Sequence, residues 1–384
     1  MQRGLCLTMD RPTDTISPRK TVEVSRCVQS AIKTGRRITP VGGRTLRRLR
    51  AAETKDTGGE PNPAQDDAGR LIIDTSLLKG IYELDKGNLT VSVGAGTTLA
   101  QLCYSVIEEG LYLPLMPYSW DKATVGGTIA ANSGSRYDGL YGRAAAFLRG
   151  MEVVTADGSV ALLGGKTVKN VTGYNLTRLY AGSLGSLGVI TKVILRLRPL
   201  PEEAIGCIIP FEQYTEAAAV ATMLRRESTP ACAETLPVLP PELLSGSQRL
   251  SEALTVLNPS PGAILAVKYE GLRPEVDSWS RWMRHRLSSL SILDQALMMD
   301  AKETEVLFDA YGRLLSSLFD DASRHQCQPG PVESGCSALR AMIARLNSGS
   351  GTWHHQLHSS VADELDPARV FLPDGSGIFT ACSP

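Results

Sequence analysis

The sequence ATVGGTIAANSG at residues 123–134 has very little side-chain bulk, and it restricts the possible folds more than any other stretch. A hydrophobic core segment carries more Leu and Ile, and a solvated loop carries more charge. A segment between these extremes suits a backbone that is pressed closely against another group. Its backbone N–H groups are not shielded by bulky side chains. We therefore predict a glycine-rich loop that lies against a large ligand.

Two further glycine-rich segments lie in the same half of the chain, PVGGRT at 40–45 and GSLGSLG at 182–188. Each of these alone is explained by a simple turn or by close packing of one backbone on another. Together with 123–134, the segment 40–45 predicts a large anionic cofactor that is held from two sides, since arrays of N–H groups suit a phosphate.

The stretch LTVSVGAGTTLAQL at 89–102 is similar to the start of a dinucleotide-binding fingerprint, with a strand, a G-x-G turn and a helix. Leu99 stands where the third glycine of that fingerprint belongs. The only acidic residue near the ribose-binding position is Asp121, in an expected loop. We favour an ordinary tight turn between strand and helix over an NAD site.

Apolar periodicity predicts mixed secondary structure in both halves of the chain. The segment 98–109 is expected to be a helix that begins with a capping box of Thr98 and Gln101. MEVVTADGSVALL at 151–163 predicts a hairpin that turns at Asp157 and Gly158. Leu200 and Pro201 mark an expected domain boundary. The other expected helices are 18–35, 213–226, 272–290 and 301–319, the other strands are 36–40, 71–76, 89–93, 189–199 and 263–269, and loops are expected at 46–69 and 236–244.

Composition excludes several classes of function. Lys plus Arg equals Asp plus Glu at 40 each, and aromatic residues make up only 5%, which disfavours a nucleic-acid binder. No apolar run reaches the roughly eighteen residues of a membrane span, and the first residues lack a leader-like apolar core, so we expect a cytoplasmic protein. The 8 cysteines include no C-x-x-C pair, which indicates buried, reduced thiols rather than an iron–sulfur cluster or structural zinc held by this chain.

Five segments, taken in order, resemble the FAD-binding domain of the vanillyl-alcohol-oxidase family, also called the PCMH type. They are PVGGRT, LTVSVGAGTTLAQL, ATVGGTIAANSG with YG at 141–142, MEVVTADGSV, and GYNLTRLYAGSLGSLGVITKVILRLRP. Within that family, KNVTGYNLTRLYAGSLGSLGVI is most similar to the FAD-binding subunits of bacterial glycolate oxidases. The resemblance implies an α+β fold: a domain of two α+β subdomains at 1–200 and a smaller α+β cap domain at 201–384. The closing segment at 360–384 contains ELDPARVFLPDG.

The resemblance also implies which residues bind FAD. Segment 41–45 would wrap the pyrophosphate from one side, and 124–127 would cover it from the other. Segment 130–134 would run beside the ribityl chain and the flavin, and 188–190 would meet the adenosine end through backbone groups. The expected cofactor-binding residues are Val41, Gly42, Gly43, Arg44, Thr45, Pro117, Thr124, Val125, Gly126, Gly127, Ala130, Asn132, Ser133, Gly134, Tyr141, Gly142, Gly188, Val189 and Ile190.

The activity that the resemblance implies is oxidation of a 2-hydroxy acid such as glycolate or D-lactate. The electrons would leave to an acceptor or to a partner subunit that carries iron–sulfur clusters, beside a second flavin subunit. FAD would be bound non-covalently, because no histidine precedes His285. Two alternatives remain: an FAD-binding subunit with no substrate chemistry of its own, and a scaffold that has lost the cofactor. Arg44, in place of the family's extra glycine, and FLPDG, in place of its Asn-Pro-Gly-Lys ending, leave the last alternative open.

The catalytic residues are not identified by the sequence. His354 and His358 in TWHHQLHSS would share one face of a helix and could hold a metal, but we favour surface or packing histidines and predict no metal site. The arginines Arg281, Arg284 and Arg286 around His285 could neutralise a substrate carboxylate, although a solvated helix face is the interpretation that we favour.

Overall fold

The computed structural model describes residues 14–45, 70–117, 119–165, 175–236, 252, 263–290, 292–293 and 296–322, with side chains up to Tyr311 in the last helix. The expected loop at 46–69, nearly all of that at 236–244, the histidines after His285 and the closing segment 360–384 lie outside these residues.

The first described elements form a small α/β unit. Strands β1 (Asp14–Ile16), β3 (Leu71–Asp74) and β2 (Ile38–Val41) form a parallel sheet in that order. Helix α1 (Thr21–Thr34) packs its apolar face on this sheet through Val24, Val28 and Ala31, and it ends at Gly35 with a φ of 63°. Positive φ favours glycine, so the predicted helix end is confirmed. The predicted strand at 71–76 stops at Asp74 because a 3-10 turn, η2 (Thr75–Leu77), follows it.

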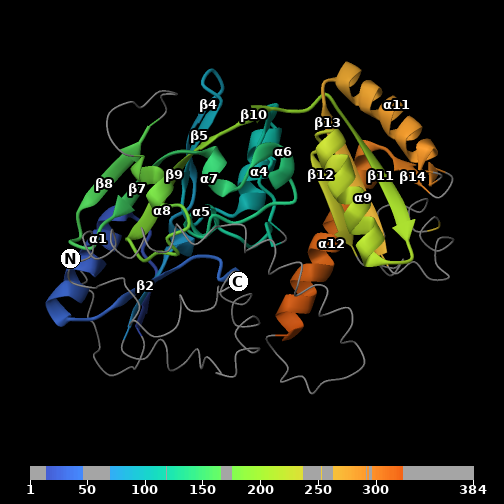
Figure 1. Ribbon diagram of the computed structural model, residues 1–384. Helices are drawn as coiled ribbons and strands as arrows, with labels where there is room; N and C mark the ends of the chain where they lie inside the picture. Colours follow the sequence, from blue (N-terminus) through green and yellow to red (C-terminus); the bar gives the residue numbers. More distant parts are fainter. Residues whose placement is uncertain are drawn as a thin grey trace.

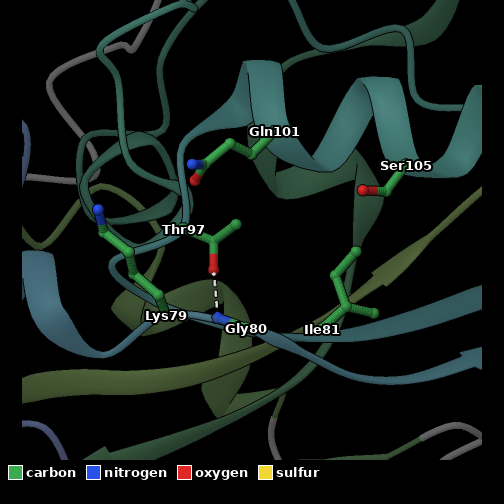
Figure 2. A pocket seen from close by; sticks show the side chains of 6 residues that line it. All are labelled: Lys79, Gly80, Ile81, Thr97, Gln101 and Ser105. Carbon is green, nitrogen blue, oxygen red and sulfur yellow. Dashed lines mark hydrogen bonds between the residues drawn. The ribbon is translucent and has the colours of Figure 1, made fainter.

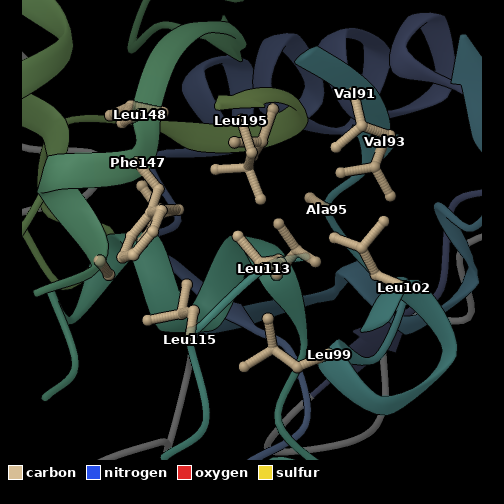
Figure 3. Close-up of a cluster of buried hydrophobic side chains, with 14 of the residues drawn as sticks. Val91, Val93, Ala95, Leu99, Leu102, Leu113, Leu115, Phe147, Leu148 and Leu195 are labelled. Carbon is tan, nitrogen blue, oxygen red and sulfur yellow. The ribbon is translucent and has the colours of Figure 1, made fainter. Parts of the chain in front are cut away.

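A five-stranded antiparallel sheet forms the second unit, in the order β4-β5-β9-β7-β8. One of its faces carries a large apolar core that contains Val91 and Val93 of β5 together with Leu99 and Leu102 of helix α4 (Leu99–Ile107) (Figure 3). The predicted hairpin at 151–163 is confirmed as the antiparallel pair of β7 and β8. The strands are β4 (Ile81–Asp85), β5 (Thr90–Gly94), β7 (Leu148–Val154), β8 (Val160–Gly164) and β9 (Val189–Arg196).

Short elements connect this sheet to the rest of the half. Helix α4 (Leu99–Ile107) has the predicted capping box of Thr98 and Gln101. A two-stranded sheet pairs β6 with β10. The short elements are β6 (Leu111–Tyr112), α5 (Val125–Ala130), α6 (Asp138–Tyr141), α7 (Ala144–Phe147), α8 (Leu176–Tyr180) and β10 (Arg198–Pro199).

The second half is built on a four-stranded antiparallel sheet in the order β12-β13-β11-β14. Figure 1 shows this sheet and its helices gathered at one side of the molecule. Alternation along β13 separates two cores: Leu265 and Val267 face α9 and α11, whereas Ile264 and Ala266 face α12 and the first half. The elements are β11 (Glu203–Phe211), α9 (Tyr214–Glu227), β12 (Cys232–Leu236), β13 (Ala263–Gly271), α11 (Arg273–Ser289), β14 (Leu297–Met299) and α12 (Ala301–Ala322).

The mixed helix and sheet content confirms the predicted fold class. Of the helices that the structure describes, none is both long and apolar enough to cross a bilayer.

Candidate functional site

The glycine-rich segments 40–45 and 123–134 contact each other, which agrees with the prediction that they lie on two sides of one site. The backbone N–H of Gly43 donates to the hydroxyl of Thr124 at 3.3 Å. A Cβ added at Gly42 would lie 2.3 Å from that same oxygen, and one added at Gly43 would lie 2.2 Å from the carbonyl oxygen of Lys122. Because such distances are shorter than any real contact, only glycine permits this approach of the two backbones.

The segment 123–134 differs from the predicted loop, because residues 125–130 form the helix α5. Thr124 caps it by accepting from the N–H of Gly127 at 3.3 Å. The N–H groups of Val125 and Gly126 donate to the carbonyls of Thr97 and Ala95 at 2.9 and 2.8 Å. Small side chains therefore serve helix packing here, and these two amides already have acceptors within the protein.

The G-x-G turn of residues 94–96 is filled by the protein's own backbone. A Cβ at Gly94 would lie 2.2 Å from the carbonyl oxygen of Leu78, and one at Gly96 would lie 2.1 Å from that of Thr75. The N–H of Gly96 donates to the carbonyl of Leu78 at 2.9 Å. This close packing supports the tight strand–helix turn that we favoured over an NAD site.

The third glycine-rich segment lies between β2 and the end of α5. The N–H of Leu184 donates to the carbonyl of Ala130 at 2.8 Å, and a Cβ at Gly185 would lie 3.1 Å from Pro40. At its end, Gly188 has a φ of 149°, and its Cβ would lie 2.5 Å from the carbonyl oxygen of Val154. All three glycine-rich segments therefore converge around α5 and β2.

The start of β9 is part of the central sheet. Val189 and Ile190 pair with Val154 and Val153 of β7, and the Val189 side chain is fully buried. Contact of residues 188–190 with adenosine stays a prediction that rests on backbone groups.

Other expected FAD residues lie around these segments. The carbonyl of Val41 accepts from the Thr75 hydroxyl at 2.9 Å. Arg44 has a φ of 57° and lies 3.9 Å from the Asp74 carboxylate. Thr45 is the last described residue before 46–69, and Pro117 accepts from the N–H of Trp120 at 2.9 Å.

A compact turn joins α5 to α6 and α7. The side-chain oxygen of Asn132 accepts from the N–H of Ala145 at 2.9 Å, and the Ser133 carbonyl accepts from that of Ala144 at 3.3 Å. Asn132 and Gly142 have φ angles of 46° and 81°. A Cβ at Gly134 would lie 3.1 Å from the Asp138 carboxylate. These bonds fix the path of the backbone from α5 to Tyr141.

Two buried hydroxyls at this convergence have no hydrogen-bond partner within the described residues. They are the side chains of Thr39 on β2 and Thr128 on α5. Buried hydroxyls in folded proteins are normally paired. Both therefore fit a site that also receives polar groups from a cofactor.

The described histidine and cysteines match the interpretations that we favoured. His285 is exposed on α11, where Arg286 pairs with Glu227 at 2.6 Å. Cys27, Cys103, Cys207 and Cys232 are buried free thiols, and burial raises the pKa of Cys103 and Cys207 to about 12. The other four cysteines and four histidines lie outside the described residues.

A hollow of about 340 Å³ lies beside α4 (Figure 2). Lys79, Gln101 and Ser105 line it, and the Thr97 hydroxyl accepts from the N–H of Gly80 at 3.0 Å. None of the expected FAD residues lies in it.

Known proteins show what this part of the chain is similar to. Residues 12–164 match the FAD binding domain family. This part of the chain is therefore similar to FAD binding domains. Over 79% of its length, the chain shares its fold with p-cresol methylhydroxylase, at a TM-score of 0.58 and 17% identity, and the match covers 62% of that protein. The predicted PCMH-type fold is therefore confirmed.

Two of the curated relatives are named as glycolate oxidase subunits. The chain is 33% identical to glycolate oxidase subunit GlcD of Bacillus subtilis over 59% of this chain and 45% of that protein. It is 28% identical to glycolate oxidase subunit GlcE of Escherichia coli over 78% of this chain and 85% of that protein. The chain thus spans less than half the length of GlcD and most of the length of GlcE.

Proposed function

We propose that this chain is an FAD-dependent oxidoreductase, or the flavin subunit of one, that oxidises a 2-hydroxy acid such as glycolate or D-lactate. The observation that carries the proposal is the convergence of three glycine-rich segments around two unpaired hydroxyls in an FAD binding domain. Relatives named as glycolate oxidase subunits and D-lactate dehydrogenases support the substrate class.

The residues at the convergence would hold FAD non-covalently. The backbone of 41–45 and the segment 124–134 would enclose the pyrophosphate and ribityl chain, and the hydroxyls of Thr39 and Thr128 would gain partners. Bound FAD supplies an acceptor for the two electrons that the hydroxyl-bearing carbon loses as the acid becomes a 2-oxo acid. The hydrogen on that carbon would go with the two electrons to the flavin as a hydride, and the hydroxyl proton would go to solvent or to a base that the sequence does not identify.

We also propose that the chain has two domains, an FAD binding domain at 1–200 and a cap domain at 201–384. The start of β11 at Glu203, after β10 ends at Pro199, supports this boundary. We also propose a cytoplasmic location and a complex with an iron–sulfur partner and a second flavin subunit. The name "subunit" carried by both glycolate oxidase relatives supports a complex.

A second candidate is an FAD-binding subunit that performs no substrate chemistry by itself. The match to 85% of a relative that is named as an oxidase subunit supports a chain that works as one subunit of a complex.

An anaerobic titration separates the candidates. Purified protein, reconstituted with FAD, is mixed with glycolate, D-lactate or D-2-hydroxyglutarate while the visible flavin absorbance is followed. Bleaching by one of these acids supports the enzyme. A yellow protein that bleaches only with its partner subunits present supports the second candidate, and a protein that FAD cannot reconstitute overturns both.

A further inference from the structure

A buried ion pair stands on the face of β13 that is turned toward the FAD binding half. The ammonium of Lys268 lies 2.8 Å from the carboxylate of Glu270, and the two side chains are only 3% and 2% exposed. The strand is otherwise mostly apolar, with Ala266 and Ile264 on the same face. A buried pair is costly to desolvate and needs further hydrogen bonds to be tolerated.

Three tyrosines of the first half supply those hydrogen bonds. The hydroxyl of Tyr141 donates to Glu270 at 2.9 Å, and that of Tyr112 donates to its other oxygen at 3.4 Å. Lys268 donates to the hydroxyl of Tyr137 at 3.1 Å and also contacts Glu305 of α12. The two charges of one half are therefore bonded to three phenols of the other.

The rings of the tyrosines also contact each other. Tyr141 lies between the other two, with ring centroids 6.3 Å from Tyr112 and 6.4 Å from Tyr137, both edge-on. The guanidinium of Arg198 stacks over the Tyr141 ring at 4.7 Å. Edge-to-face rings and a stacked cation restrict the orientation of Tyr141.

The protonation states suit this network. Burial, followed by the negative charge of Glu270, raises the pKa of Tyr141, so its hydroxyl stays a donor. Burial alone would lower the pKa of Lys268, but Tyr137, Glu305 and Glu270 raise it well above its usual value. The ammonium therefore stays charged, and Glu270 accepts from donors on three sides.

We propose that Lys268 and Glu270 are positioning residues that hold Tyr141 against the FAD site, so that the second half sets the affinity of the first half for FAD. Tyr141 closes α6, and the turn at Gly142 follows it directly. The inference rests on the proposed placement of Tyr141 and Gly142 beside FAD. A merely structural network would stabilise the fold equally through Tyr112 and Tyr141 and would leave FAD affinity unchanged.

Tyr141→Phe and Tyr112→Phe form a matched pair for the test. Each removes one hydroxyl from Glu270 and keeps a ring in the same cluster, but only Tyr141 is an expected FAD residue. The full-length apoprotein of each variant, of Glu270→Gln and of Tyr141→Phe/Glu270→Gln is titrated with FAD while flavin fluorescence is followed. Thermal unfolding of each apoprotein is recorded alongside.

The expected result is that Tyr141→Phe and Glu270→Gln each raise the Kd for FAD about tenfold, the loss expected for one hydrogen bond to a charge. The Kd of the double variant for FAD should be no higher than that of the single variant that binds FAD less tightly, because both substitutions act through the same contact. Tyr112→Phe should bind FAD within about twofold of wild type.

Two results overturn the inference. Equal Kd values for Tyr141→Phe and Tyr112→Phe, with wild type binding FAD, show that the network is structural only and leave the proposed function intact. Failure of wild type itself to bind FAD removes the proposed function and this inference together.

Discussion

The N–H of Gly43 reaches the hydroxyl of Thr124 across 81 residues of sequence. The same oxygen accepts from Gly127, so one hydroxyl joins two glycine-rich segments and caps α5. Thr124 is 3% exposed, and water cannot easily replace it as an acceptor. The geometry of the expected pyrophosphate site therefore depends on one side-chain oxygen.

We expect Thr124→Val to lower the free energy of unfolding by about 1–3 kcal/mol, because it leaves two amides without their acceptor. Thr124→Ser keeps the oxygen and should cost about 1 kcal/mol or less. Urea unfolding of the apoproteins measures both. A loss in Thr124→Ser as large as that in Thr124→Val would contradict the prediction, because the variant that keeps the acceptor would then be no more stable than the one that lacks it.

Gly43→Ala should destabilise the fold by about 1–3 kcal/mol, since its Cβ would overlap the carbonyl of Lys122 and force a backbone shift. Gly139→Ala is the matched control in α6, where a Cβ meets nothing within 4 Å. That control should be neutral or more stable by about 0.5–1 kcal/mol. Thermal unfolding compares them, and a stable Gly43→Ala variant would contradict the close approach.

The stability contributed by Asp138 should fall as pH rises. Burial raises the pKa of its carboxyl to about 6, although the N–H of Ser135 donates to it at 2.8 Å. Since the folded value lies above the unfolded one, the contribution is full below about pH 4 and is lost as pH passes 6. Asp138→Asn keeps an acceptor for Ser135. After allowance for partial exposure, the free energy of unfolding of Asp138→Asn should exceed that of wild type by about 1–2 kcal/mol at pH 7.5 and by little at pH 4. Unfolding in urea at both pH values gives the comparison, and a gain independent of pH would refute the assignment.

Lys268→Met should lower the free energy of unfolding by about 3–5 kcal/mol, because it leaves Glu270 buried without its cation. Lys268→Met/Glu270→Gln should recover part of that loss. The exposed pair of Arg273 and Glu203, at 3.1 Å, is the control, and Arg273→Met should cost less than about 1 kcal/mol. Denaturant unfolding ranks the three variants, and a double variant less stable than Lys268→Met would argue against an uncompensated charge.

Local patterns in the sequence predicted most described elements. Three of these features depend only on contacts within a few residues, so they can be predicted from the sequence alone. They are the capping box of Thr98 and Gln101, the helix end at Gly35 and the turn at Asp157 and Gly158. The helix α5 was missed, because its glycines read as a loop and its stability comes from Ala95 and Thr97, about thirty residues away.

The network around Lys268 was also missed. The only signal was an alternation of Lys268 and Glu270 in an apolar strand, which is equally typical of a strand with a solvated face. Their partners Tyr112, Tyr137 and Tyr141 lie more than a hundred residues earlier. No local pattern connects such residues.

The sequence by itself therefore predicted a large anionic cofactor from its glycine-rich segments, because glycine is required where backbones approach closely. The fold and the FAD cofactor were predicted by the resemblance of those segments, in their order, to a known family. Only the tertiary structure decided which amides already have acceptors, which hydroxyls lack partners and which charges meet across the two halves. Those properties depend on distances between segments that the chain brings together only when it folds.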